Sequence, residues 1–258
     1  MHKLAFQQGQ TIIHSLYPIV KFAWLVFGSI LVFVIRNEYI LWLLTLILLW
    51  ILTSLKSDIW HVRGFRLTLV TGLLLLVLYI IFDKTGTLLI DPGINFLTIT
   101  SGGLGLGLRV SGRFLAIVFM SYIFILTTDP NQLAYSLMKI GLPYLYGFML
   151  VTTLRLAPIL EEEGKTIYRA QLVRGVRYDQ QNLKKLFLII QQFLTPLLIS
   201  SLRRADKLVF SMEGRGFGKY PTRTFRNQDR PSALDWKISI GLVIFFSLLL
   251  LINFGVFS

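Results

Sequence analysis

Residues 22–55 read FAWLVFGSILVFVIRNEYILWLLTLILLWILTSL, two uncharged apolar runs separated by the polar triplet at 36–38. Three further runs follow at 67–82, 114–128 and 238–258. A helix needs roughly 20 apolar residues to cross a bilayer. The shorter runs can use their flanks, because the charged ends of Lys21 and Arg113 can reach the headgroups. No run shows the alternation of a barrel strand, so the sequence predicts an all-α, polytopic membrane bundle with about five spans.

The composition of the whole chain also indicates a membrane protein. Of its 258 residues, 54% are hydrophobic and 15% are charged, and the mean hydropathy is +0.66, whereas soluble domains carry about 25% charged residues. The chain has no Cys, which excludes disulfides and thiolate chemistry, and its three His at positions 2, 14 and 61 lack metal-ligand spacing. We therefore expect no metal site and no redox chemistry.

The distribution of charge predicts an orientation and a division of the chain. Cations follow the second run at 56, 63 and 66, whereas residues 83–107 carry one Lys against two Asp. Because positive loops stay in the cytoplasm, we expect the N-terminus inside and the C-terminus outside.

A second basic region lies between the fourth and fifth runs, where residues 129–235 hold sixteen Lys and Arg against nine Asp and Glu. Two diluted apolar runs in it, 140–154 and 186–202, are therefore expected to lie at the cytoplasmic face rather than to cross. The predicted parts are a four-span bundle at 1–128, a cytoplasmic region of long amphipathic helices at 129–235 and a last span at 236–258.

Two long helices of this region are predicted to end in the same way. One runs from about 145 to Arg174 and stops at Gly175, and the other runs from about 182 to Gly214-Arg215-Gly216. An Arg in the last turn complements the negative end of a helix, and a following Gly suits a cap, so capping explains the pattern. A guanidinium can also bind a partner's carboxylate through two hydrogen bonds. Both interpretations stay open from the residues alone.

Other patterns resemble chemical sites. Residues 83–87 read DKTGT, the string whose aspartate is phosphorylated in cation pumps. A polar turn is the simpler interpretation, because a nucleotide domain does not fit the chain. The alternative function is a membrane-bound phosphoryl-transfer enzyme or cation pump using Asp83.

Three other patterns have simpler structural interpretations. The glycines at 102–107 are expected to form a flexible or re-entrant loop. The carboxylates at 161–163 are expected to form a solvated face. The aromatic residues of the basic region are not interleaved with its cations, so a protein or lipid partner is expected rather than nucleic acid.

Several short motifs together resemble one family of membrane proteins. They are His14-Ser15-Leu16-Tyr17-Pro18 with Lys21, Thr127-Thr128-Asp129-Pro130, Gly141-Leu142-Pro143, Leu154-Arg155-Leu156-Ala157-Pro158, Ala170-Gln171-Leu172-Val173-Arg174-Gly175, Leu202-Arg203-Arg204-Ala205-Asp206 and Ser211-Met212-Glu213-Gly214-Arg215-Gly216-Phe217-Gly218. With these motifs the chain resembles the transmembrane T component of energy-coupling factor transporters, which import vitamins and nickel or cobalt ions. The family's coupling triplets usually read Ala-Arg-Gly or Ala-Arg-Ser, whereas here they are Val173-Arg174-Gly175 and Gly214-Arg215-Gly216, with both Arg retained.

The resemblance implies a bacterial cell-membrane subunit with no catalytic residue and no cofactor of its own. Its partners would be two cytoplasmic ATP-binding subunits, identical or different, which bind the ATP, and one membrane-embedded substrate-binding S component. The residues that would bind the ATP-binding subunits are Arg174, Gly175, Arg215 and Gly216, supported by Ala170, Val173, Glu213, Gly214 and Gly218. The residues that would contact the S component are Leu186, Ile190, Leu194 and Leu198. The long cytoplasmic helices would then be coupling helices.

Overall fold

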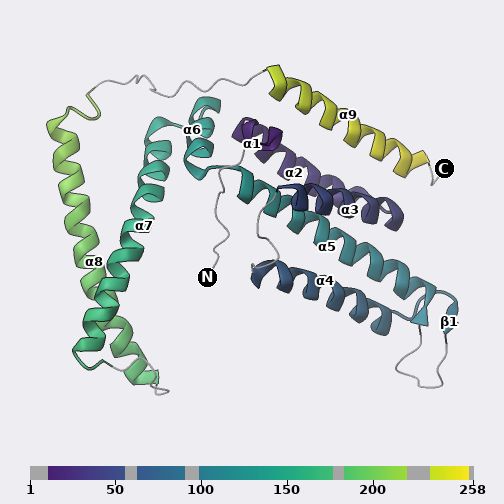
Figure 1. Cartoon of the computed structure of the whole chain (residues 1–258), viewed down its shortest axis with the longest axis horizontal. Coiled ribbons are helices and arrows are strands. Elements are labelled where there is room, and N and C mark those ends of the chain that lie inside the picture. The colour runs from purple at the N-terminus through teal and green to yellow at the C-terminus, as the bar shows by residue number, and fades with distance from the viewer. Residues whose placement is uncertain (1–10, 56–62, 91–98, 177–182, 220–232, 256–258) are drawn as a thin grey trace. The chain divides into compact units, whose positions relative to one another are not determined.

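The computed structural model of the chain describes residues 11–55, 63–90, 99–176, 183–219 and 233–255 (Figure 1). Its elements in chain order are α1 (Ile12–Ser15), α2 (Pro18–Val34), α3 (Glu38–Ser54), α4 (Arg63–Phe82), β1 (Leu88–Ile90), β2 (Ile99–Thr100), α5 (Ser101–Thr127), α6 (Pro130–Ile140), α7 (Tyr144–Val173), α8 (Leu183–Gly214) and α9 (Ala233–Gly255). The all-α prediction is confirmed, with one short antiparallel hairpin, β1–β2, added between α4 and α5.

The chain divides into two compact units. The first, the bundle, comprises α1 to α6, the β-hairpin and α9, and the second, the α7–α8 hairpin, comprises α7 and α8. The five predicted spans correspond to α2, α3, α4, α5 and α9. Residues 64–82 and α5 are long and apolar enough to cross a bilayer, and α2 and α3 are shorter apolar helices. The predicted boundaries at 128 and 235 concern the two sides of a membrane and stay a prediction.

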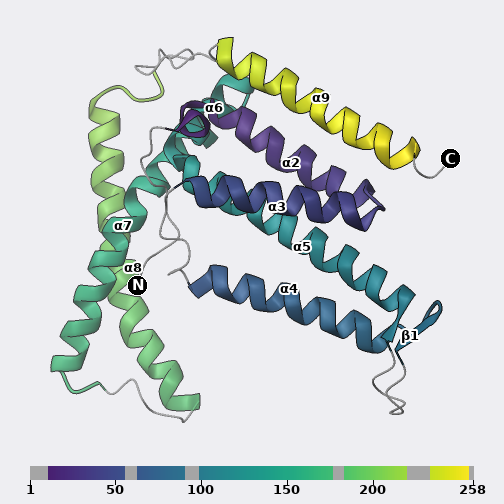
Figure 2. The ribbon, with the colours of Figure 1, turned by 45° about the vertical axis from the view of Figure 1, so that its right-hand side comes forward.

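Helix α5 is the centre of the bundle and contacts α2, α3 and α4; α4 and α5 lie side by side in both ribbon views (Figures 1 and 2). One face of α3 is buried against α5, with the side chains of Leu41, Leu44 and Leu48 each at most 4% exposed. The opposite face of α3 keeps Leu43 and Trp50 exposed. An apolar helix with only one face covered by protein suits a lipid environment.

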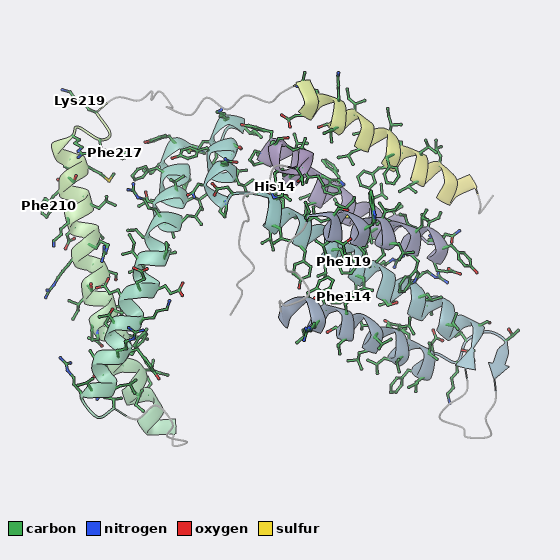
Figure 3. All side chains as sticks on the ribbon, in the orientation of Figure 1. His14, Phe114, Phe119, Phe210, Phe217 and Lys219 are labelled. Carbon is green, nitrogen blue, oxygen red and sulfur yellow. The ribbon has the colours of Figure 1, made fainter. Side chains whose placement is uncertain are left out.

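An aromatic contact joins α4 to the core. The ring of Phe65 stacks on that of Phe119 of α5, with centroids 5.9 Å apart, and it meets the ring of Tyr122 at 6.0 Å. Phe119 is labelled in Figure 3. Tyr122 also shares a 3.1 Å hydrogen bond with Thr68 of α4. The hydroxyls therefore satisfy each other inside the apolar interface, as buried polar groups require.

Residues 102–107 are helical, so the expected flexible loop is wrong. They form the first turns of α5, where the side chain of Thr100 accepts a hydrogen bond from the Gly103 backbone N–H (3.2 Å). A Cβ at Gly103 would lie 2.5 Å from the carbonyl O of Asp83, and one at Gly107 would lie 3.0 Å from that of Leu76. The glycines are present because α4 packs this closely on α5, as small residues four apart allow between membrane helices.

Helix α5 also starts 13 residues earlier than the predicted fourth span, with Arg109 and Arg113 inside it. The Arg113 guanidinium donates to the carbonyl O of Ile35 at the end of α2 (2.8 Å). The Arg109 Nε lies 3.5 Å from Glu38 Oε2 at the start of α3. The guanidinium of Arg113 therefore binds a carbonyl at the end of a neighbouring helix, and whether it also reaches the headgroups stays a prediction.

Helices α7 and α8 pack as an antiparallel pair. Near the middle of the pair Glu163 of α7 contacts Arg204 of α8, and near its closed end the Gln171 side-chain amide donates to the carbonyl O of Gln192 (3.2 Å). The bounds of both helices agree with the predicted ones to within a residue or two. Each is one continuous helix, although α7 contains Pro158 and α8 contains Pro196.

Candidate functional site

Helix α7 ends in a Schellman motif with Arg174 as the C-cap residue. Gly175 has a positive φ of 84°. Its backbone N–H donates to the carbonyl O of Leu172 (3.0 Å), and the N–H of Val176 donates to that of Gln171 (3.1 Å). These are the two bonds that define the motif. The prediction that Gly175 caps this helix is confirmed.

Helix α8 ends in the same motif, with Arg215 in the place of Arg174. Gly216 has a φ of 68°. Its N–H donates to the carbonyl O of Glu213 (2.9 Å), and the N–H of Phe217 donates to that of Met212 (3.0 Å). The two Arg-Gly ends are therefore one backbone structure used twice.

Among the residues that the structure describes, neither guanidinium group has a partner. The last carbonyls of each helix already accept backbone N–H groups, so side-chain capping is not needed. Within the described ranges, neither Arg174 nor Arg215 donates a side-chain hydrogen bond or forms an ion pair, and both residues are exposed. Val173, beside Arg174, is 90% exposed.

The surface around the two ends is open. A Cβ added at any of the glycines at 175, 214, 216 and 218 would meet no atom within 4 Å. Ala170, on the last turns of α7, is also exposed. Small residues with free space around them permit close approach of another protein surface.

The two arginines lie at opposite ends of the α7–α8 hairpin. Arg174 ends α7 at the connection to α8, whereas the residue two after Arg215 packs on the rings of Tyr144 and Phe148, in the first turns of α7. Since α7 has 30 residues, a rise of about 1.5 Å per residue separates the two ends by roughly 40 Å. One small partner site cannot bind both arginines.

The carboxylates at 161–163 have different surroundings. Glu161 forms a solvated i,i+4 ion pair with Lys165 (3.0 Å), as expected. Glu163 instead accepts a hydrogen bond from the Ser200 hydroxyl and a 3.0 Å bond from the Arg204 guanidinium, both on α8. The bond from Ser200, followed by Arg204, lowers the pKa of Glu163 below its ordinary value. The expectation of a solvated face is therefore wrong for Glu163.

Next to Glu163 the two helices approach closely. Gly164 is buried, and a Cβ on it would lie 3.5 Å from the ring of Phe193. A groove of about 760 Å³ runs along this contact. Its lining consists mainly of apolar side chains, with the cations of Lys165 and Arg169 among them. In the parts of the chain that the structure describes, no three His, Asp or Glu side chains gather as a metal site.

The predicted S-component residues lie on α8. The side chains of Ile190, Leu194 and Leu198 are between 43% and 58% exposed and follow one another at four-residue spacing, so they form one apolar stripe. Leu186 continues the spacing towards the start of α8, but its side chain lies outside the described set. An exposed apolar stripe on a helix indicates a protein or membrane contact.

Asp83 lies in a turn between α4 and β1. Its Oδ1 accepts hydrogen bonds from the backbone N–H (3.0 Å) and the hydroxyl (2.7 Å) of Thr85. These bonds lower the pKa of Asp83. Gly86 has a φ of 93°, and the N–H of Thr87 donates to the Ser101 hydroxyl (3.1 Å) at the start of α5. This geometry is that of an Asx turn, which supports the polar-turn interpretation of DKTGT.

The motif near the N-terminus forms a buried polar contact that we call the Lys21 clasp. The Lys21 ammonium donates to the carbonyl O of Thr127 at the end of α5 (2.7 Å) and of His14 (3.1 Å). Asp235 of α9 accepts from the Tyr17 backbone N–H (2.8 Å) and attracts the Lys21 charge. Lys21 is 4% exposed, so the prediction that it reaches the headgroups is wrong.

Comparison with known proteins gives one consistent result. Residues 9–225 match the sequence model of the CbiQ family, described as cobalt transport protein. The protein described as energy-coupling factor transporter transmembrane protein EcfT from Listeria innocua is 32% identical over 83% of this chain and 84% of its own length. Proteins with the same description from Macrococcus caseolyticus and Lactococcus lactis subsp. cremoris are each 30% identical, over 88% and 94% of this chain and 86% and 94% of their own lengths.

Proposed function

The chain belongs to the CbiQ family, as a transmembrane T component of energy-coupling factor transporters, and from this premise we propose that it couples ATP-driven movement to import. In this proposal two cytoplasmic ATP-binding subunits bind the two Arg-Gly ends, and a membrane-embedded S component, which selects a vitamin or a transition-metal ion, binds the exposed stripe of α8. The chain itself performs no chemistry and binds no cofactor.

The single observation that carries the proposal is the repeated helix end. Two copies of one Schellman motif each present an exposed guanidinium that has no partner in the described part of the chain. Because they lie roughly 40 Å apart by helix length, each end suits one subunit of a pair rather than a shared groove. A planar guanidinium binds a carboxylate through two parallel hydrogen bonds, which a Lys cannot reproduce.

The surroundings of the two ends support a docking role. At the end of α7, the nearly fully exposed side chain of Val173 offers an apolar contact beside the charge of Arg174. At the end of α8, glycines at 214, 216 and 218 leave the backbone accessible. An apolar contact next to a charge that loses its water on binding is typical of residues that dominate an interface.

The experiment reverses the charge at each end. We expect Arg174→Glu and Arg215→Glu each to weaken binding of the ATP-binding subunits by about 2–5 kcal/mol, the cost of leaving a buried charge without its partner. The double variant should lose these subunits during purification and lose uptake, while the chain still inserts in the membrane. Arg→Lys variants should bind with intermediate strength, because the charge remains but the planar fork does not.

Lys207→Glu is the matched control, because Lys207 is exposed on α8 two turns before Arg215 and outside the cap. It should leave the complex unchanged. An intact complex and normal uptake in the Arg174→Glu, Arg215→Glu double variant would contradict the proposal and leave the arginines as solvated ends of helices.

A further inference from the structure

The two Arg-Gly ends share a backbone structure but differ in the residue that completes the motif. At the end of α7 this residue is Val176, and at the end of α8 it is Phe217. A hydrophobic contact at this position commonly accompanies a Schellman motif and reaches back to the same helix. Here the aromatic ring of Phe217 reaches the other helix of the hairpin.

Phe217 forms a three-ring cluster with the start of α7. Its ring centroid lies 4.8 Å from that of Phe148 and 6.1 Å from that of Tyr144. Tyr144 and Phe148, one turn apart, are themselves stacked at 6.1 Å. These separations are those of favourable aromatic pairs. All three residues belong to the α7–α8 hairpin.

The backbone fixes the ring of Phe217 relative to Arg215. The two residues are separated only by Gly216, whose positive φ is set by the motif, and the Phe217 N–H is bonded to the last turn of α8. Arg215, the cap and the ring therefore move as one piece. A displacement of the Arg215 end therefore also displaces Tyr144 and Phe148, on which the ring packs, because close-packed side chains transmit strain.

The ring packs against the point at which the chain enters the hairpin. α7 begins at Tyr144, directly after Gly141-Leu142-Pro143, and α6 of the bundle ends at Ile140. Gly141 has a φ of 127°, and a Cβ there would meet no atom within 4 Å. The start of α7 thus follows a short segment with a backbone conformation that favours glycine.

We infer that Phe217 is a positioning residue that transmits movement of the Arg215 end to the first turn of α7 through the rings of Phe148 and Tyr144. The inference rests on the proposed docking of Arg215 and adds the route by which that docking acts on the rest of the chain. It makes the two ends unequal, because the ring of Phe217 links the Arg215 end to the start of α7, whereas the corresponding residue at the Arg174 end, Val176, carries no ring.

The test uses the complete complex of this chain with its ATP-binding subunits and S component, reconstituted in vesicles. For Phe217→Ala we expect normal assembly and an ATP hydrolysis rate within about twofold of the wild-type rate, with at least tenfold less substrate imported per ATP hydrolysed. Phe217→Tyr keeps the ring and should restore most of the import. Phe148→Ala removes the same contact from α7 and should give the same loss, and the double variant should be no worse than either single one.

Phe210→Ala is the matched control. Phe210 is an aromatic residue of α8, the helix that Phe217 follows, and its side chain is 72% exposed (Figure 3). It should not change import per ATP. Equal import per ATP in Phe217→Ala and the wild type would overturn the inference. So would loss of the ATP-binding subunits in Phe217→Ala, since the ring would then support the docking end itself. Failure of the proposed function gives a different result, because Arg215→Glu would then retain both ATP-binding subunits whatever Phe217 does.

Discussion

The three consecutive glutamates at 161–163 on α7 point in different directions around the helix and so have different partners. Measuring stability as a function of pH can distinguish Glu163 from its neighbours. Glu163 accepts hydrogen bonds from Ser200 and Arg204, and its pKa is lowered. A lowered pKa in the folded state means that the ionised form stabilises the hairpin. This stabilisation is complete well above the ordinary pKa of 4.5 and is lost as the pH falls through the lowered value.

We therefore expect Glu163→Gln to lower the thermal unfolding midpoint of the purified chain at pH 7, and the difference from the wild type to shrink as the pH falls below 4.5 and through the lowered pKa. Glu162→Gln is the control, since Glu162 is exposed and has no bond to α8. A constant difference across the pH range would show that the carboxylate charge does not matter at this contact.

The residue scale is also where sequence reasoning was most and least successful. The caps at Gly175 and Gly216 could be predicted because a helix cap depends on neighbouring residues only. A Gly that follows the last residue of a helical apolar pattern is sufficient to indicate it. The contacts of Glu163 and Phe217 could not, because their partners are 41 and 69 residues away in the chain. Nothing in the sequence distinguishes Glu163 from Glu162 until α8 is packed against α7.

At the scale of helix pairs, the glycines of α5 give a prediction with an internal control. Gly103→Ala places a Cβ 2.5 Å from the carbonyl O of Asp83, so α4 and α5 must separate. We expect a loss of about 1–3 kcal/mol in the free energy of unfolding, as for other overpacked sites. Gly105→Ala meets its first atom, of the Arg109 side chain, at 3.7 Å. This variant should be neutral or gain up to about 1 kcal/mol from helix propensity.

Unfolding of the purified chain in mild detergent measures both variants. Equal stability of the Gly103 and Gly105 variants would contradict the close α4–α5 packing. The same glycines explain why the loop prediction at 102–107 was wrong. Glycine weakens an isolated helix, so its frequency at 102–107 argued against a helix. In the folded bundle the carbonyl groups of α4 lie so close to α5 that a larger residue would not fit. This packing cannot be deduced from the sequence of α5 alone.

The stripe on α8 gives a second prediction at this scale. Leu198→Arg puts a charge at the C-terminal end of the stripe, where the side chain is 58% exposed and is not part of the buried core. We expect membrane insertion to persist and binding of the S component to fall at least tenfold, about 1.4 kcal/mol or more. Thr195→Arg, exposed on the same helix but off the stripe, should bind normally. The measurement is the amount of S component that co-purifies; failed insertion of Leu198→Arg would mean that α8 spans the membrane.

For the whole molecule, the positive-inside expectation remains to be tested. The chain has no Cys, so single Cys residues can be placed without a background. With an impermeant thiol reagent on intact cells, we expect Lys84→Cys to be labelled and Lys207→Cys to be labelled only after the membrane is broken. Labelling of Lys207→Cys alone in intact cells would reverse the orientation and place both Arg-Gly ends on the side that lacks ATP.

The positions of the five apolar helices could be read from the sequence, whereas their lengths could not. The apolar runs predicted both ends of α3 and the end of α2 to within one residue, whereas α2 begins four residues before its run, at Pro18, and includes Lys21. The start of α5 was missed because the sequence predicted Arg113 at the edge of the fourth span, whereas both Arg109 and Arg113 lie inside the helix. Their partners, Glu38 and the carbonyl O of Ile35, come from the turn between two other helices, and such a turn is placed only by the assembled bundle.

The Lys21 clasp has a consequence for synthesis. Asp235, whose carboxylate accepts from the Tyr17 backbone N–H and attracts the Lys21 charge, lies 218 residues after Tyr17 in the chain. A ribosome therefore makes α2 and α5 well before α9, so the Lys21 ammonium can bond to the carbonyl O of Thr127 before any carboxylate is available to it. The order of translation thus leaves α9 to supply the counter-charge to a contact that α2 and α5 can already form.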